Sequence, residues 1–238
     1  MTLVNRALRR LGLGSYLPRN VFEVADLDCL MRALRWQHAP VLVGDDVEAF
    51  ADMPDINHRR LRDAEAIGAA CRNCGGRTLL EIGTGDGRTT ALMAANAPEA
   101  LVHTVNMLPD DLPTAGRLVT AAPDRDHIGR RYRDLGLTNI RQIYANTATW
   151  TPDLGPIDLA FIDGCHDADF VVNDTRLVLA ASHPGTVILW HDFAPPLRAN
   201  FDWVDAVCRG VDRLYHRRLL RGPILHLRDS FVGIHVVP

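Results

Sequence analysis

The chain has 238 residues, which is enough for one large α/β domain or for a domain with a small appendage. Its formal net charge of −3 gives no electrostatic reason to expect nucleic acid as the main partner. All 26 Lys and Arg positions are arginine, and the absence of lysine excludes Schiff-base chemistry, a pyridoxal phosphate anchor and a Walker-type phosphate loop.

The first third of the chain, residues 1–75, is predicted to form a helical arm or lid. Residues 3–11 interleave arginines with apolar residues, which is typical of an amphipathic segment. Such a segment can lie on a membrane surface, but we favour one that covers the active site or joins two copies of the chain. Helical periodicity continues over 22–36 and 58–71, and an acidic, loop-like stretch over 45–57 separates them.

Residues 76–238 alternate strand and helix patterns, which predicts one domain with a mainly parallel sheet. Strands are expected at 78–82, 101–105, 140–144, 157–162 (an apolar run suited to a buried central strand) and 186–190. Helices are expected at 89–96, 128–135, 166–181 and 197–215. The proline-rich and acidic stretch 107–126 is predicted to be a loop or insertion, and 219–227 with 231–237 a closing antiparallel pair.

Five cysteines are too few and too scattered to form a disulfide framework. Cys71-x-x-Cys74 is the one close pair, and a zinc site would need a second pair that the sequence lacks. One turn of helix ending at Gly75-Gly76 explains the spacing more simply. No apolar run is long enough to span a bilayer, and no signal-peptide pattern is present, so a cytoplasmic location is expected.

The sequence LLEIGTGDGRTT, residues 79–90, joins the first strand of the sheet to its helix. An apolar run ends in Glu81 and turns through Gly83, Gly85 and Gly87. Glycines allow positive φ and let a ligand approach the main chain closely. The spacing is Gly-x-Gly-x-Gly rather than the Gly-x-Gly-x-x-Gly of nicotinamide-dinucleotide sites, which favours a nucleoside ligand without phosphates.

Polar residues stand where the expected strands end: Glu81, Asn106, Asn146, Asp163 and His191-Asp192. Ligands of open α/β sheets bind beyond the carboxyl ends of the strands, so we expect these residues to meet at one site. Asp163 and Asp192 could hold a hard divalent cation, and His166 could take a proton from a substrate hydroxyl. Structural explanations stay open: Asp163 could cap a helix, His191 could be a core histidine, and Asn146 could cap a turn.

The glycine motif resembles the first motif of class I S-adenosylmethionine (SAM) dependent methyltransferases. Asp163-x-x-His166, followed by His191-Asp192, looks like the metal-dependent O-methyltransferase branch that includes macrocin-type sugar O-methyltransferases and cephalosporin-hydroxylase-like proteins. The resemblance covers residues 76–238. It implies an α/β fold with a Rossmann-like, seven-stranded, mostly parallel sheet, here with an N-terminal helical extension.

The resemblance also implies a set of site residues. Those expected to bind SAM are Glu81, Gly83, Thr84, Gly85, Gly87, Asn106, Asn146 and Asp163. Asn106 stands where the family usually has an acid that grips the ribose, and its amide oxygen can still accept a hydrogen bond. The implied metal ligands are Asp163, His191 and Asp192, and His166 is the implied base. His191 replaces a glutamate of the family, and imidazole suits manganese, iron or zinc better than magnesium.

We therefore expect an enzyme that transfers the methyl group of SAM to a hydroxyl of a small molecule, a sugar or a natural-product scaffold. A divalent metal, Mg²⁺ or Mn²⁺, would assist it. Neither nucleic acid nor a membrane span is expected, and homo-oligomerisation is left open. Two alternatives remain: a SAM-binding module without transferase activity, which Asn106 and His191 would fit, and an NAD-dependent oxidoreductase, which the glycine spacing disfavours.

Overall fold

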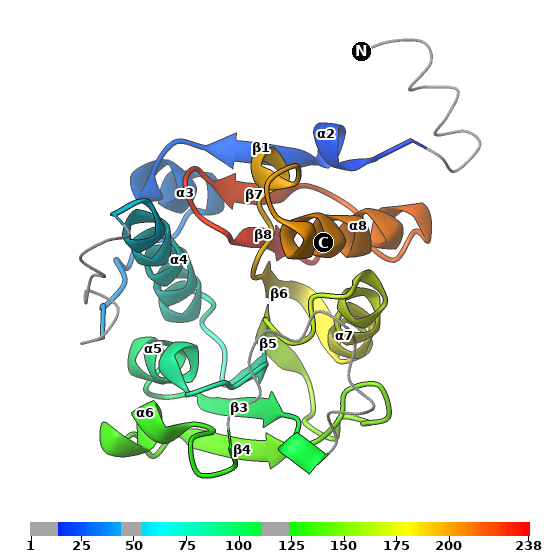
Figure 1. Ribbon diagram of the computed structural model, residues 1–238. Helices are drawn as coiled ribbons and strands as arrows, with labels where there is room; N and C mark the ends of the chain where they lie inside the picture. Colours follow the sequence, from blue (N-terminus) through cyan, green and yellow to red (C-terminus); the bar gives the residue numbers. More distant parts are fainter. Residues whose placement is uncertain (1–13, 44–53, 111–123) are drawn as a thin grey trace.

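A computed structural model describes residues 14–43, 54–110 and 124–238 (Figure 1). The arginine-rich segment expected at 3–11 therefore lies outside the described residues. The same holds for most of the acidic stretch at 45–57 and of the insertion at 107–126.

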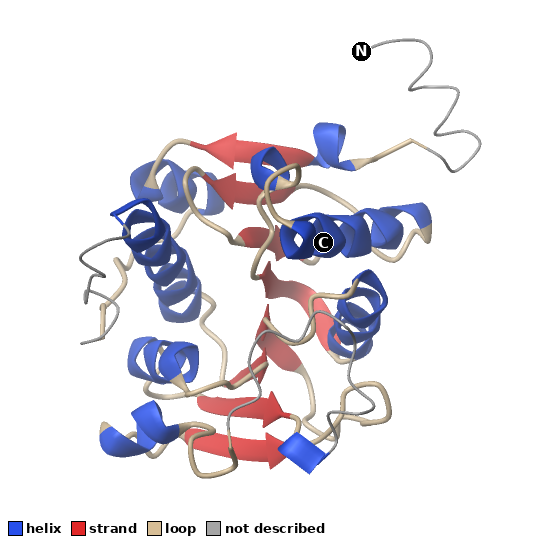
Figure 2. Cartoon of the chain, viewed as in Figure 1, coloured by secondary structure: helices blue, strands red, loops and turns tan. Residues whose placement is uncertain are grey.

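Eight strands form one sheet in the order β1-β7-β8-β6-β5-β2-β3-β4 (Figure 2). In chain order they are β1 (Val21–Val24), β2 (Thr78–Ile82), β3 (Leu101–Asn106), β4 (Ile140–Tyr144), β5 (Ile157–Ile162), β6 (Ser182–Trp190), β7 (Ile224–Leu227) and β8 (Gly233–Val236). Neighbouring strands are parallel, except that β8 runs antiparallel to β6 and to β7. The predicted α/β class and mostly parallel sheet are confirmed.

Helices cover both faces of this sheet. They are α2 (Leu17–Asn20), α3 (Leu27–Leu34), α4 (Pro54–Asn73), α5 (Arg88–Asn96), α6 (Arg130–Asp134), α7 (Ala168–Ala180), the 3₁₀ helix η3 (Pro195–Leu197) and α8 (Asp202–His216). In Figure 1, α3, α4 and α5 lie on the left face and α7 and α8 on the right. Among the described helices, none is both long enough and apolar enough to cross a membrane.

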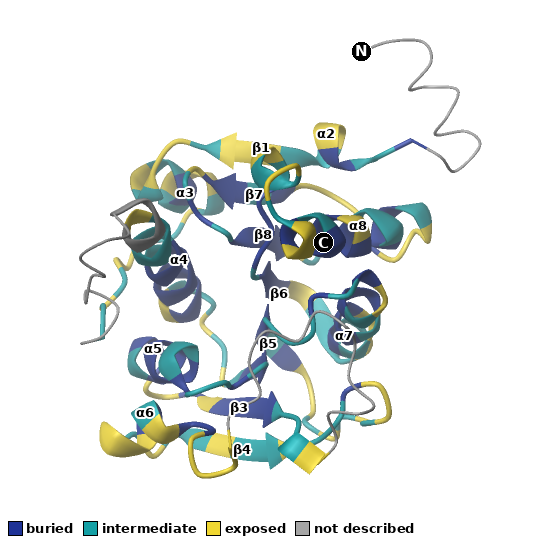
Figure 3. Ribbon diagram, in the orientation of Figure 1, coloured by how far each residue is buried: buried dark blue, intermediate teal, exposed yellow. Residues whose placement is uncertain are grey.

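Two apolar cores result, because alternate residues of a strand point to opposite faces. Leu80 of β2 and Ala160 of β5 join the core under α7 and α8, whereas their neighbours Leu79 and Leu159 join the core under α4 and α5. All four side chains are fully buried, and Figure 3 shows the central strands in dark blue. A sheet buried on both faces is what continuous apolar strands such as β5 predict.

The N-terminal extension adds an eighth strand to the seven expected. The sequence predicts a helix over 22–36, but Val21–Val24 is strand β1 and the helix α3 covers only Leu27–Leu34. A four-residue strand carries too little periodicity to be distinguished from the helix that follows it. Its conformation is set by parallel pairing with β7, near the other end of the chain.

The remaining elements lie close to their predicted positions. The helix expected at 197–215 is divided into η3 and α8, and the helix expected at 128–135 shortens to α6. The closing pair at the end of the chain is antiparallel as predicted. Strand β2 lies between β3 and β5, so the strand order reverses there, and open sheets bind ligands at such a reversal.

The end of β6 is held in place by a tight contact with β8. Asp192, two residues after the strand, has a φ of 52°, and Phe193 beside it is fully buried. A Cβ atom on Gly233 of β8 would lie 2.4 Å from the Cδ1 atom of Phe193. The missing side chain of Gly233 therefore makes room for the ring that anchors the His191-Asp192 turn.

We predict that Gly233→Ala destabilises the protein by about 1–3 kcal/mol, because the added methyl group overlaps a ring that has no space to move into. Urea denaturation measures the free energy of unfolding. The double variant Gly233→Ala/Phe193→Leu should lose less than the sum of the two single variants, since the smaller side chain relieves the overlap. Full additivity of the two losses would contradict this account.

Candidate functional site

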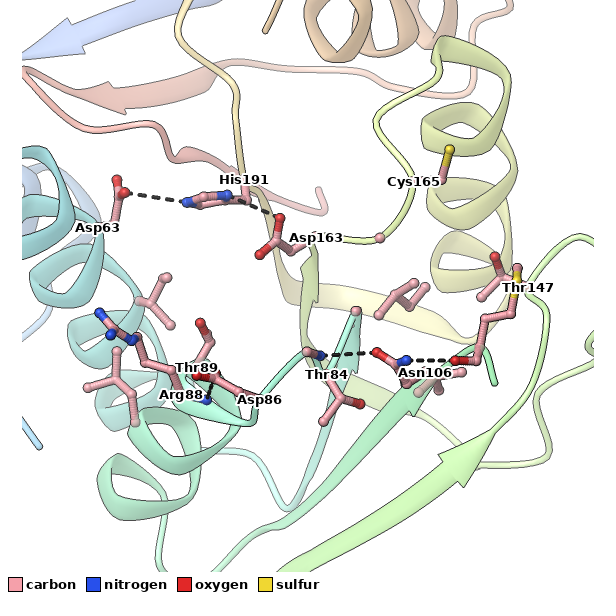
Figure 4. A pocket seen from close by; sticks show the side chains of 18 of the residues that line it. Asp63, Thr84, Asp86, Arg88, Thr89, Asn106, Thr147, Asp163, Cys165 and His191 are labelled. Carbon is pink, nitrogen blue, oxygen red and sulfur yellow. Dashed lines mark hydrogen bonds and ion pairs between the residues drawn. The ribbon is translucent and has the colours of Figure 1, made fainter. Parts of the chain in front are cut away.

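A cavity of about 530 Å³ opens at the carboxyl ends of the central strands (Figure 4). This volume lies within the ordinary range for small-molecule sites. Of the predicted site residues, six line it: Gly83, Thr84, Gly85, Asn106, Asp163 and His191. The other five, Glu81, Gly87, Asn146, His166 and Asp192, stand behind this wall or beside it. Helices α4 and α5 close the side of the cavity opposite α7.

The glycine turn brings the end of β2 against the end of β5. Gly83 has a φ of 105°, and a Cβ atom there would lie 2.0 Å from the carbonyl oxygen of Asp163. Gly87, with a φ of 90°, is the N-cap of α5, and a Cβ atom there would meet the backbone of Gly129 at 2.8 Å. Gly83 thus shapes the cavity floor, whereas Gly87 serves the packing of the helix.

Asn106 ties the glycine turn to the end of β3. Its Oδ1 accepts a hydrogen bond from the backbone N–H of Gly85 at 3.0 Å, and its Nδ2 donates to the carbonyl oxygen of Met107 at 2.7 Å (Figure 4). The amide lines the cavity and also holds the turn in shape.

Glu81 lies beneath the turn, fully buried, and does not line the cavity. Its Oε2 accepts hydrogen bonds from the hydroxyl of Thr90 and, at 2.5 Å, from that of Thr104. Burial raises the pKa of Glu81 from 4.5 to about 8, because the interior disfavours the charged carboxylate more than the two hydroxyls favour it. The sequence predicts a direct contact with the cofactor; in the structure the carboxyl group does not line the cavity and joins α5 to β3 through these two hydroxyls.

The three predicted metal ligands converge, with one ligand atom from each of Asp163, His191 and Asp192 lying within 4.8 Å of the others. The Nδ1 of His191 is 3.1 Å from Asp163 Oδ1 and 3.5 Å from Asp192 Oδ2. Asp163 follows β5 and the other two follow β6, so parallel pairing of these neighbours brings the ligands together. The Asp192 carboxylate also accepts a hydrogen bond from Trp203 Nε1 at 3.3 Å.

His166 joins this cluster from behind. Its Nε2 lies 3.1 Å from Asp192 Oδ2 and 3.6 Å from Asp163 Oδ1, and its ring is buried outside the cavity lining. The histidines and carboxylates shift one another's pKa values. Burial alone would raise the pKa of Asp163, but the charge of His191 and the hydrogen bonds from both histidines bring it down to about 2. Burial alone would lower the pKa of His166, yet its contacts with Asp163 and Asp192 raise it.

Asn146 takes the turn-capping role that the sequence left open. Its Oδ1 accepts a hydrogen bond from the backbone N–H of Ala148 at 2.9 Å, and its neighbours Ala145 and Thr147 line the cavity in its place.

Sequence reasoning missed Asp63, which lines the cavity from α4 and lies 3.4 Å from His191 Nε2. It also missed the lining arginines Arg60 and Arg88 and the ring of Phe170. The one signal for Asp63 is an acid beside Ala64 and Ile67, on a helix face that is otherwise buried. No motif in the sequence links that helix to the end of β6.

Comparison with known proteins agrees with this geometry. Residues 80–193 match the model of a methyltransferase domain family. TomG from Streptomyces achromogenes, an O-methyltransferase involved in tomaymycin synthesis and solved with SAM, is 17% identical; the match covers 74% of this chain and 80% of that one, with a TM-score of 0.51.

The SAH-bound methyltransferase PaMTH1 from Podospora anserina is 14% identical, over 98% of this chain and 96% of that one, with a TM-score of 0.52. At these identities the likeness shows a shared fold. A search of curated proteins gives no match.

We predict that Gly83→Ala destabilises the protein by about 3 kcal/mol or more, since its Cβ atom would combine a disfavoured φ with a clash against rigid backbone. Gly85→Ala is the matched control: its φ is 53° and its Cβ atom would meet nothing within 4 Å. This control should lose only about 1 kcal/mol. Similar losses for the two variants, measured by urea denaturation, would refute the close approach of β2 and β5.

Glu81 gives a prediction about pH. A carboxyl group with a raised pKa in the folded state stabilises the fold fully below its unfolded pKa of 4.5, and this contribution is lost as pH rises through about 8. Between pH 5 and 8, wild-type stability should therefore fall more steeply than that of Glu81→Gln, by at most about 1.4 kcal/mol per pH unit. Urea denaturation at several pH values tests this, and parallel stability curves would contradict it.

Proposed function

We propose that the chain, whose residues 80–193 match a methyltransferase domain model, transfers the methyl group of SAM to a hydroxyl of a small molecule. The observation that carries this proposal is the meeting of the glycine turn with Asp163, His191 and Asp192 around one cavity. Two structural neighbours with a bound ligand, TomG with SAM and PaMTH1 with SAH, support the choice of cofactor.

We place the nucleoside against Asn106, Ala145 and Thr147, which line the cavity together with the turn of Gly83 and Gly85. The methyl group would then face Asp163 and His191. The acceptor hydroxyl would enter beside these two side chains, and α4 would form its outer wall.

Methyl transfer from a sulfonium is an in-line displacement, so the protein mainly needs to align donor and acceptor and to help the hydroxyl lose its proton. The fixed backbone of the glycine turn supplies alignment. The two histidines stand next to carboxylates that can stabilise the proton after transfer. We propose His166 as the final holder of that proton, reached through Asp192.

The cluster also fits a divalent cation. Two carboxylates and one imidazole form a mixed oxygen–nitrogen ligand set that suits Mn²⁺, Fe²⁺ or Zn²⁺. The Nδ1 of His191 is buried and faces Asp163 and Asp192, the other two candidate ligands. When bound by Asp163, His191 and Asp192, such an ion would lower the pKa of an acceptor hydroxyl and make its deprotonation easier.

The acceptor class is proposed as a sugar or another natural-product scaffold. It rests on the resemblance of the Asp163-x-x-His166 and His191-Asp192 segments to sugar O-methyltransferases. TomG, which acts in tomaymycin synthesis, is in keeping with this class. We further propose a cytoplasmic protein with no nucleic-acid partner, in which α4 of the predicted N-terminal arm covers the site.

The test combines binding with turnover. Calorimetry should show binding of SAM and S-adenosylhomocysteine but not of NAD. Methylation of a panel of hydroxyl compounds should fall with chelator, and Asp192→Asn should lower kcat about 100-fold while keeping SAM affinity. Asp205→Asn, an ion-paired aspartate on α8, is the control and should keep wild-type kcat.

Three other outcomes would favour a different function or mechanism. Binding of NAD in place of SAM would overturn the proposal. Binding of SAM without turnover on any compound of the panel would favour a binding module. Activity that survives both chelation and Asp192→Asn would contradict the role of the metal and leave the proposed methyl transfer standing.

A further inference from the structure

Asp63 of α4 contacts the proposed site from the side opposite Asp163. Its Oδ2 lies 3.4 Å from His191 Nε2, and its Oδ1 accepts a hydrogen bond from the backbone N–H of Phe231 at 2.6 Å. Asp63 is buried, with 6% of the residue exposed, and it lines the cavity. Figure 4 shows it on the far side of the imidazole, so the ring of His191 lies between two acids.

The ring of His191 is held on its faces as well as at its nitrogens. Phe161 approaches it edge-on with 5.8 Å between ring centroids, and Phe231 lies 6.4 Å away at a tilt. One nitrogen, Nε2, faces Asp63, and the other, Nδ1, faces Asp163 and Asp192. The orientation of the imidazole is therefore determined by the three acids around it.

We propose that Asp63 is a positioning residue: it accepts the Nε2–H of His191 and so leaves Nδ1 to complete a nitrogen–oxygen–oxygen site for a divalent cation with Asp163 and Asp192. This rests on the cation of the proposed function. Histidines that bind metals commonly donate their second N–H to a carboxylate, which fixes the tautomer and orients the ring. Asp63 is the carboxylate that stands in that place.

A purely structural role for Asp63 makes a different prediction, because its two oxygens have separate partners. The bond to Phe231 ties α4 to the segment between β7 and β8, whereas the contact with Nε2 concerns the ring of His191. The variant Asp63→Asn tests these two contacts separately. The amide oxygen can still accept from Phe231, but its NH₂ group donates to Nε2, so the ring proton moves to Nδ1 and blocks a cation there.

The experiment uses Mn²⁺ alone as probe on the full chain after chelator treatment, with affinity measured by calorimetry. Asp63→Asn should weaken Mn²⁺ binding at least tenfold while keeping the wild-type melting temperature and SAM affinity. Pulsed electron paramagnetic resonance should show nitrogen coupling from one imidazole in the wild type, and this coupling should be lost in the variant.

Asp158→Asn is the matched control. Asp158 also faces an imidazole, His183 Nε2 at 3.0 Å, and accepts backbone N–H bonds from Arg77 and Thr78, but it lies at the amino ends of the strands. The same chemical change there should leave Mn²⁺ affinity unchanged. A purely general effect of losing an aspartate–histidine pair would weaken Mn²⁺ binding in both variants and would overturn the proposal.

Two further results would overturn it: Mn²⁺ affinity of Asp63→Asn within twofold of wild type, or no Mn²⁺ binding by the wild type. In the second case SAM binding and methyl transfer, measured separately, still decide the proposed function. If Asp63→Asn cannot be purified folded, wild-type protein with ¹⁵N-labelled histidine and Zn²⁺ gives the answer by NMR. His191 should carry its proton on Nε2, and coordination through Nε2 would refute the assignment.

Discussion

The close approach of two strand ends supports everything else in this site. Gly83 presses against the carbonyl oxygen of Asp163, and the backbone N–H of Asp163 donates to Ile82 at 2.8 Å. A side chain at Gly83 would force β2 and β5 apart at the point where the strand order reverses. Because they stay together, the turn that we assign to the cofactor and the first acid of the cluster share one wall of one cavity. The position of Asp163 is thus set by backbone contact rather than by its own side chain.

Charge balance is the second constraint. Three carboxylates, Asp63, Asp163 and Asp192, surround two imidazoles, His166 and His191, at 3.1–3.6 Å. Partly buried acids at such distances would repel one another without the positive charge between them. Positive charge at this place therefore stabilises the cluster, whether a proton on an imidazole or a divalent ion carries it. This explains how a histidine can stand where the resembled family has a glutamate and still leave a coherent set of ligands.

Local signals in the sequence were sufficient where a feature depends on neighbouring residues. The bounds of β2 and β5 follow from apolar runs, and the convergence of Asp163, His191 and Asp192 follows from their places after adjacent parallel strands. The features that escaped prediction depend on distant partners. Strand β1 exists because β7 pairs with it, and Asp63 reaches His191 across 128 positions of sequence. Glu81 and Asn146 were placed correctly along the chain, but the direction of their side chains is decided by Thr90, Thr104 and the turn after β4.

The place of β8 between β6 and β7 has a consequence for how the chain acquires its structure during synthesis. Among the described strands β8 is the last in chain order, yet it sits inside the sheet, and β1, the first of them, pairs with β7. During synthesis, β1 must therefore wait for its partner until β7 has left the ribosome. Pairings this far apart in sequence close slowly and expose strand edges meanwhile. The half of the sheet from β2 to β6 can assemble first, and the final strands then lock the N-terminal segment onto it.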